Sequence, residues 1–207
     1  MPETKKSKVR EYAETIIIAL AIALFVRTFV VQAFKIPSES MKPTLLVGDH
    51  ILVNKFIYGI RIPFVGKRIV TFKDPKRGDV IVFKYPEDRS KDFIKRVIGL
   101  PGDTVEFKDR TIYINDRPIE DPWGVYKKDN PSWRSSASKN YDPQVVPPGA
   151  LFVMGDNRDN SLDSRVWGCV PFDDVLGEAF IMYWSWDWDA PSVVSKVRWK
   201  RIGSLIH

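Results

Sequence analysis

The apolar positions of this chain follow two different patterns, which change at about residue 35. Residues 16–34 read IIIALAIALFVRTFVVQAF, a run in which Arg27 is the only charged residue. A helix of about 20 apolar residues spans the hydrocarbon core of a bilayer. The pattern therefore predicts a single transmembrane helix, which we place at residues 15–34, preceded by a basic tail at residues 1–14.

Two observations favour a retained membrane anchor over a cleaved leader. No small-x-small cleavage site precedes Phe34, as a removable signal peptide would require. Four basic residues stand against Glu3 within the first ten positions. Basic residues flank transmembrane helices on the cytoplasmic side. We therefore expect a single pass with a cytoplasmic N-terminus, and a following domain on the outer, or periplasmic, side of the cytoplasmic membrane.

Beyond residue 35 the rhythm is that of strands. Short runs rich in Val, Ile, Phe and Tyr alternate with Gly, Pro, Asn and Asp, which is typical of an all-β domain. We expect this domain to cover residues 35–207. Within it, residues 116–149 lose the apolar rhythm, and we interpret them as a small, lightly structured insertion. The predicted strands are residues 50–58, 79–84, 92–98, 104–107, 111–114, 151–154 and 179–184.

Composition narrows the possible functions. The chain of 207 residues has one cysteine, Cys169, and two histidines, His50 and His207. A zinc site of Cys and His ligands and an intramolecular disulfide are therefore excluded. The net charge is +6, but half of it lies in the first ten residues. No dense basic stripe with interleaved aromatic residues remains, so a primary role in binding nucleic acid is not expected.

Two serines in residues 36–45, Ser38 and Ser40, directly follow the apolar run and are candidates for nucleophilic chemistry. A serine nucleophile needs a base, and neither histidine is convincing in that role. A lysine can act instead if burial lowers its pKa. Strand alternation places Lys95 on one face with Phe93 and Val97, between two apolar neighbours. A lone strand lysine that reaches out to water remains the alternative.

Residues 155–165 read GDNRDNSLDSR, directly after an apolar run. A calcium loop starting at Asp156 fails, because Arg158, Ser161 and Trp167 occupy its third, sixth and twelfth positions. Two interpretations remain open. One is a solvated polar loop. The other is a rigid bracket of two ion pairs, Asp163 with Arg165 and Asp156 with Arg158, that holds a neighbouring site.

Four ordered motifs resemble those of bacterial type I signal peptidase, the membrane-anchored Ser/Lys protease family that includes leader peptidase. They are Pro-Ser-x-Ser-Met-x-Pro-Thr-Leu at 37–45, Arg-Gly-Asp-Val at 77–80, Lys-Arg-Val-Ile-Gly-Leu-Pro-Gly-Asp at 95–103, and residues 155–165. With the apolar run, the resemblance covers almost the full length. It implies an N-terminal transmembrane helix followed by a mainly antiparallel β catalytic domain of signal-peptidase type, with residues 116–149 as a small insertion.

The resemblance also implies roles for individual residues. Ser40 matches the nucleophile, Lys95 the general base, and Ser38 the side chain that joins the Ser40 backbone N–H in the oxyanion hole. Ser161 matches the residue that orients the lysine. Asp163 and Arg165 match the structural ion pair beside the site, to which the bracket interpretation adds Asp156 and Arg158. The positions that would line the substrate groove are Ile36, Pro37, Phe93 and Ile94.

The implied function is a membrane-anchored serine endopeptidase that removes signal peptides from exported preproteins after Ala-x-Ala-like sites. Its expected partners are those preproteins and the bilayer, without metal, cofactor or nucleic acid. Two alternatives are a Ser/Lys protease of this fold with one dedicated substrate, and an inactive module that binds export clients. Glu39 departs from the small residue that many members carry. The alternating Trp184, Trp186 and Trp188 fit either a core or a membrane-contacting belt.

Overall fold

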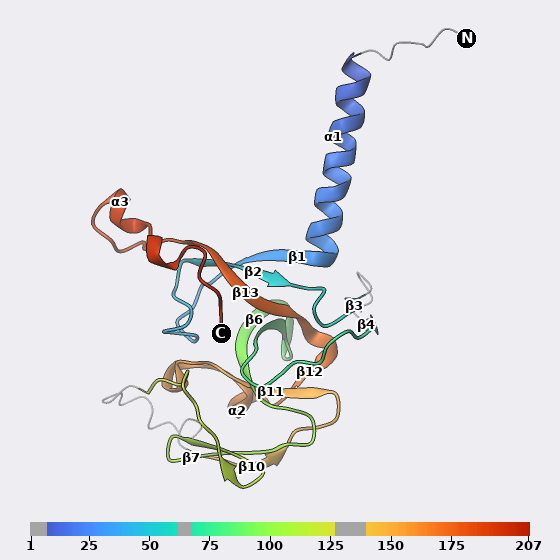
Figure 1. Ribbon diagram of the computed structural model, residues 1–207. Helices are drawn as coiled ribbons and strands as arrows, with labels where there is room; N and C mark the ends of the chain where they lie inside the picture. The colour runs from blue at the N-terminus through green and yellow to red at the C-terminus, as the bar shows by residue number, and fades with distance from the viewer. Residues whose placement is uncertain (1–7, 62–67, 127–139) are drawn as a thin grey trace.

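The computed structural model describes residues 8–61, 68–126 and 140–207. Figure 1 shows one helix, α1, rising from one side of a β domain that contains the rest of the chain. Helix α1 (Lys8–Phe25) continues into the short π-helix η1 (Val26–Val30), and strand β1 (Val31–Lys35) follows directly. Helix α1 has no buried residue. The chain thus enters the β domain without a linker.

The helix differs from the prediction at both ends. It begins upstream, where Lys8, Arg10 and Glu11 add charge, and the helical region ends at Val30. Residues 31–34, expected in the helix, instead form strand β1 and pair with β2. The reason is that the backbone of this stretch pairs in continuous register with β2 and so completes a sheet edge. Of the helices in the described ranges, none combines the length and the apolar character needed to cross a membrane.

Within the described residues, the largest sheet has seven antiparallel strands in the order β1-β2-β13-β5-β6-β11-β12 (Figure 1). Strand β13 pairs with both β2 and β5, and so joins the N-terminal strands to the centre of the sheet. The sheet confirms the mainly β, antiparallel fold. Its other strands are β2 (Asp49–Asn54), β5 (Val80–Tyr85), β6 (Asp88–Gly99), β11 (Ala150–Met154), β12 (Val170–Pro171) and β13 (Val175–Ser185).

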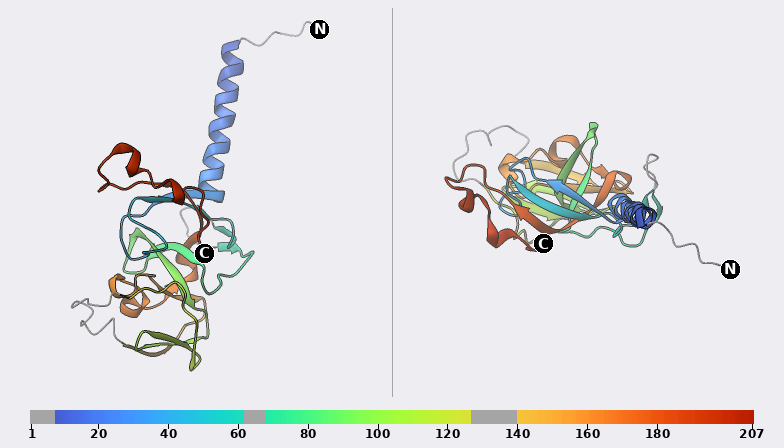
Figure 2. Two further views of the ribbon diagram at one scale, coloured as in Figure 1. Left: turned by 60° about the vertical axis from the view of Figure 1, so that its left-hand side comes forward. Right: turned by 90° about the horizontal axis from the view of Figure 1, so that it is seen from above.

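A second sheet lies beyond β11, as the two further views in Figure 2 also show. In the described chain it has four antiparallel strands in the order β10-β7-β8-β9. Its bounds are β7 (Thr104–Lys108), β8 (Thr111–Ile114), β9 (Arg117–Pro118) and β10 (Asn140–Val145). The expected insertion at 116–149 therefore contributes β9 and β10 to a sheet. Residues 127–139 of that insertion lie outside the described residues.

The remaining elements are short. Strands β3 (Ile60–Arg61) and β4 (Arg68–Val70) form a separate pair. One-turn helices connect the later strands and follow the last one. They are η4 (Arg158–Asn160), α2 (Ser164–Trp167), η5 (Phe172–Asp174), α3 (Val193–Lys196) and η6 (Trp199–Arg201).

The hydrophobic core is divided into clusters that fix the segments around the site. One cluster contains Ile36, Met41 and Leu45 from the segment between β1 and β2, packed on Val80 and Met182 of the large sheet. A separate cluster fills the space between β7, β8 and β11. Burial of a large apolar side chain stabilises a fold by roughly 1.5–3 kcal/mol. The segment that carries the two serines is therefore held by its own buried residues.

Candidate active site

Ser40 lies in the loop between β1 and β2, and its position is set by the residues around it. Met41 and Leu45 are fully buried, and the backbone N–H of Leu45 donates to the carbonyl of Met41 at 2.8 Å. Ile36 is buried on the other side of the serines. Ser40 itself is 8% exposed. The loop is thus a series of turns closed over the core, with the Ser40 hydroxyl at its inner side.

Lys95 reaches Ser40 from strand β6. Its Nζ donates to Ser40 Oγ at 2.7 Å and to the carbonyl oxygen of Ile94 at 3.0 Å. The side chain is 4% exposed, and Nζ lies 5.5 Å from the centre of the Phe93 ring. The alternative of a lysine that reaches out to solvent is therefore wrong. Residues 55 positions apart in the chain meet at one short hydrogen bond.

Burial is the main cause of an altered pKa at Lys95, which it lowers from 10.5 to about 8. The negative charges of Asp163 and Asp156 act in the opposite direction, while Arg165 lowers the pKa further. Each of the two carboxylates has an arginine partner, which reduces its effect on the lysine. The amine therefore loses its proton close to neutral pH.

Ser38 lies beside Ser40, with 3.4 Å between the two hydroxyl oxygens. Either hydroxyl can donate in this contact. Ser38 is exposed, in contrast to Ser40. Its hydroxyl is therefore next to the position where a group bound to Ser40 Oγ would lie.

Asp163 and Arg165 form the ion pair expected from the sequence. Arg165 donates from Nε to Oδ1 at 2.8 Å and from Nη2 to Oδ2 at 2.9 Å, and Asp163 also accepts the backbone N–H of Gly155 at 3.0 Å. Burial disfavours the ionised Asp163, but the charge and hydrogen bonds of Arg165, with the bond from Gly155, lower its pKa overall. The pair joins the two ends of the 155–165 segment.

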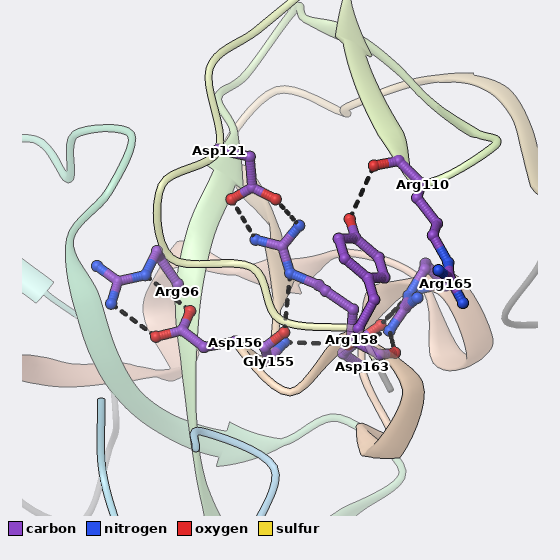
Figure 3. Close-up of polar contacts among 9 residues, drawn as sticks. Arg96, Arg110, Asp121, Gly155, Asp156, Arg158, Asp163 and Arg165 are labelled. Carbon is purple, nitrogen blue, oxygen red and sulfur yellow. Dashed lines mark hydrogen bonds and ion pairs between the residues drawn. The ribbon is translucent and has the colours of Figure 1, made fainter. Parts of the chain in front are cut away.

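The expected pairing of Asp156 with Arg158 is wrong. Asp156 accepts two bonds from Arg96, Nε to Oδ1 at 2.8 Å and Nη2 to Oδ2 at 2.7 Å, whereas Arg158 pairs with Asp121 through both Nη atoms. Figure 3 shows the two pairs side by side. Asn157 between them has φ −80° and ψ 77°, which interrupts the extended backbone, so the flanking side chains turn to different partners.

Two residues that the sequence reasoning did not single out connect this segment to the serine loop. Asn157 donates its backbone N–H to the carbonyl of Ser40 at 3.0 Å and its side-chain amide to the carbonyl of Glu39 at 3.1 Å. Thr44 donates its hydroxyl to Asp156 at 2.6 Å. Both residues lie inside motifs quoted above, and this position was the one feature of the sequence that could have indicated their role.

Ser161 lies next to the serine loop, but its expected contact with Lys95 is not among the hydrogen bonds of that amine described above. Its hydroxyl is buried, and an interaction with it helps to lower the pKa of Asp163. Gly155 separates it from the loop: a Cβ there would collide with Ser161 Oγ and with the Ser40 carbonyl oxygen. The close approach requires glycine at this position. The orienting role of Ser161 stays a prediction.

The four positions expected to line a groove are not equivalent. Ile36 and Ile94 belong to the buried core, at 2% and 9% exposure. Pro37 is exposed, and Phe93 is half-buried with its ring stacked on Tyr85 at 4.3 Å between centres. The backbone edge is more informative. Strand β11 pairs with β6 only from Arg96 to Gly99 in the described chain, so β6 extends beyond β11 at residues 91–94.

In the residues that the structure describes, no group of three or more His, Cys, Asp or Glu side chains could hold a metal ion. Ser40 and Lys95 place a hydroxyl group next to an amine of lowered pKa, the arrangement of a serine nucleophile and its base.

Comparison with known proteins gives one consistent result. The family described as "Signal peptidase, peptidase S26" matches residues 9–184. Signal peptidase I of Pseudomonas aeruginosa is 38% identical over 230 residues, which cover 95% of this chain and 79% of that protein. Signal peptidase I of Aquifex aeolicus is 37% identical over 228 residues, with 85% and 84% covered. A crystal structure of a signal peptidase I from Enterococcus faecalis has 34% identity, a TM-score of 0.43, and coverage of 52% of this chain and 98% of that one.

Proposed function

Because the chain belongs to the signal peptidase family, peptidase S26, and is a serine peptidase that hydrolyses peptide bonds, we propose that it removes signal peptides from exported preproteins with Ser40 as nucleophile and Lys95 as general base. One observation carries the assignment: a 2.7 Å hydrogen bond joins the Ser40 hydroxyl to a lysine that is 4% exposed. A buried amine of lowered pKa is the base that a serine needs in the absence of histidine.

The reaction proceeds in two stages. Neutral Lys95 takes the proton of Ser40 as Oγ attacks the carbonyl carbon of the scissile bond. The tetrahedral intermediate collapses as Lys95 returns the proton to the departing amine, which leaves the signal peptide esterified to Ser40. A water molecule then attacks the ester, again giving its proton to Lys95, and collapse of the second intermediate protonates Ser40 and frees the signal peptide.

Ser38 and the Ser40 backbone N–H are proposed to bind the oxyanion. The 3.4 Å separation of the two hydroxyl oxygens supports this, because the Ser38 hydroxyl can turn to a carbonyl oxygen bound at Ser40. A donor of this kind typically stabilises the transition state by about 3 kcal/mol. Ser161 is proposed to orient the Lys95 amine, and its buried hydroxyl lies beside the serine loop.

The charged residues behind the site are proposed to keep its geometry fixed. Asp163 and Arg165 hold Gly155, and Asp156 connects Arg96 to the serine loop through Thr44. Catalysis depends on such fixed geometry, because positions must be held within about 0.5 Å for productive chemistry.

The substrate is proposed to bind as an added strand along β6. The extension of β6 beyond β11 at residues 91–94 supports this mode, since an extended peptide pairs with an uncovered strand edge. This edge leads directly to Lys95. Small side chains in an Ala-x-Ala pattern before the scissile bond would fit the closely packed side chains beside this edge. The four side chains proposed to line it are Ile36, Pro37, Phe93 and Ile94.

We place the enzyme at the cytoplasmic membrane, with its N-terminus inside and the β domain on the outer face. The apolar run before β1 and its basic flank support an anchor. Trp188 and Trp199 give a second support, being 60% and 64% exposed, since tryptophan is enriched at membrane interfaces. Figures 1 and 2 show the loop around α3 on the side of the domain from which α1 rises. Trp184 and Trp186 are half-buried between them and the core.

The test is cleavage of a preprotein with an Ala-x-Ala site by the detergent-solubilised protein. We expect the parent to cut after the second Ala. Ser40→Ala and Lys95→Arg should fold but lose at least about a thousandfold in kcat, because one lacks the nucleophile and the other carries a guanidinium that stays protonated. A Lys95→Arg variant within tenfold of the parent would contradict the assignment.

Cleavage by all three proteins at equal rates would point to another site or a contaminant. A panel of unrelated preproteins, used beside the first substrate, separates a general enzyme from one with a dedicated substrate. If the folded parent cuts none of them, a role limited to binding is favoured instead.

A further inference from the structure

A segment far from the dyad in the sequence lies directly behind it in the structure. Residues 121–126 follow β9 and belong to the insertion that the sequence suggested was lightly structured. We call them the bracing segment. The pairing of this segment with residues 156–158 is parallel, through a β-bridge between Val125 and Asn157. Within the described chain, none of its residues hydrogen-bonds to Ser40. Its backbone hydrogen bonds are instead to Asp156 and Arg158, the two neighbours of Asn157, and Asn157 bonds to the Ser40 carbonyl.

The first attachment is an ion pair. Both Nη atoms of Arg158 donate to the carboxylate of Asp121, and Arg158 is fully buried (Figure 3). Gly124 packs flat against this pair, since a Cβ there would lie 2.9 Å from Arg158 Cζ. Removing one partner of a buried pair leaves a charge without compensation, which is strongly unfavourable. Asp121 therefore helps to hold the Arg158 guanidinium in place, together with the Gly155 carbonyl that accepts from Arg158 Nε at 3.0 Å.

The second attachment is aromatic. The ring of Trp123 lies over the guanidinium of Arg96, with 4.4 Å between Cζ and the ring centre. The same ring closes over Gly78, where a Cβ would come within 3.0 Å of it. Arg96 is fully buried and holds Asp156 by two hydrogen bonds. A tryptophan face is the best aromatic partner for a guanidinium.

The third attachment is made by the backbone. Val125 N–H donates to the carbonyl of Asp156 at 2.8 Å, and Arg158 N–H donates to the carbonyl of Val125 at 3.0 Å. Asn157, between these two residues, holds the Ser40 carbonyl at 3.0 Å. A displacement of the bracing segment is therefore transmitted to the nucleophile through residues 156–158.

We propose that the bracing segment fixes the position of the Ser40 loop, and that Asp121 and Trp123 are positioning residues of the peptidase reaction. The inference rests on the proposed function of Ser40. The two side chains act on opposite ends of the same three-residue link. Asp121 holds Arg158 and Trp123 holds the Arg96–Asp156 pair, so Asn157 between them presents its N–H at a fixed place.

The kinetic test compares Trp123→Ala and Asp121→Ala with Glu120→Ala, an exposed neighbour outside these contacts. Each positioning variant should lose about tenfold to a hundredfold in kcat, since a displacement near 1 Å can have that effect. KM should stay within about twofold, because residues 91–94, which bind the substrate, are untouched. Trp123→Phe keeps a ring over Arg96 and should recover most of the lost kcat.

A second measurement needs no turnover. Hydrogen exchange of residues 38–45 and 155–158 should be faster in Trp123→Ala and Asp121→Ala than in the parent or in Glu120→Ala. The proposal would be overturned if all four proteins exchanged hydrogen at equal rates, or if the positioning variants changed KM alone. It would also be overturned if Trp123→Phe had no higher kcat than Trp123→Ala. A parent that does not cut, or Ser40→Ala that cuts like the parent, overturns the proposed function alone, and exchange still decides the bracing.

If either alanine variant does not fold, Asp121→Asn takes its place. This variant keeps the shape of the side chain and removes its charge, so it should show the same faster exchange with a smaller loss of kcat.

Discussion

Strand β6 carries two lysines, four residues apart, in opposite surroundings. The side chain of Lys91 is 63% exposed and forms an ion pair with Asp88 at 2.8 Å. Lys95 is 4% exposed, and its hydrogen bonds run to the Ser40 hydroxyl and to a backbone carbonyl. The same residue type thus faces solvent at one end of the strand and donates to a buried hydroxyl near the other end.

The difference shows what turns a lysine into a base. An exposed ion pair contributes little to stability, in general about 0–1 kcal/mol, and it leaves the amine charged. A buried amine that lacks its own carboxylate is costly when charged, and this cost is what makes its neutral form accessible. The fold accepts the cost at Lys95 because strand pairing holds this part of β6 in place: β5 pairs with Lys95 and Arg96 on one side, and β11 pairs from Arg96 on the other.

Replacing Lys95 by methionine should have the largest effect on this comparison. We expect Lys95→Met to lose at least about a thousandfold in kcat, because the proposed general base is absent. The same change should raise the free energy of unfolding at pH 7 by about 2 kcal/mol, since a charge no longer has to be buried. Urea denaturation of both proteins measures this difference. A variant that is inactive because it is less stable than the parent would contradict the account.

The pH dependence of the parent is the next largest effect. Burial lowers the pKa of Lys95 to about 8, and only the neutral amine can accept the Ser40 proton. Below that pKa the neutral fraction falls tenfold per pH unit, so kcat/KM should rise with pH and level off above about 8. A profile between pH 5 and 10, with a substrate that has no group titrating in this range, tests it. A plateau already reached at pH 6 would exclude Lys95 as the base.

Features set by residues close in the sequence could be predicted from the sequence, and contacts between distant residues could not. Alternation placed Lys95 on one face with Phe93 and Val97, since a strand fixes side-chain direction locally, but it left open whether the amine reaches solvent. The partner of Arg158 was not predictable in the same way. Asp121 lies 37 positions away in a stretch without apolar rhythm, so nothing local points to it. Adjacent charges suggested Asp156 instead, but one non-extended residue, Asn157, was enough to separate them. The sequence motifs indicated which residues form the candidate site. The ion pairs that hold those residues in place depend on contacts between residues far apart in the sequence.

The smallest effect is expected at the exposed Lys91. Its replacement by methionine is the matched control for Lys95→Met. Lys91→Met makes the same chemical replacement on the same strand. It removes an exposed ion pair with Asp88, so the free energy of unfolding should change by less than about 1 kcal/mol. The pH at which kcat/KM levels off should stay near 8, because Lys91 is not part of the buried group. A moderate change in KM is compatible with the account, since Lys91 lies on the proposed substrate edge. A shift of the pH midpoint by a full unit would not be, because it would show that the charge at the exposed end of the strand, rather than burial at the inner end, sets the pKa of Lys95.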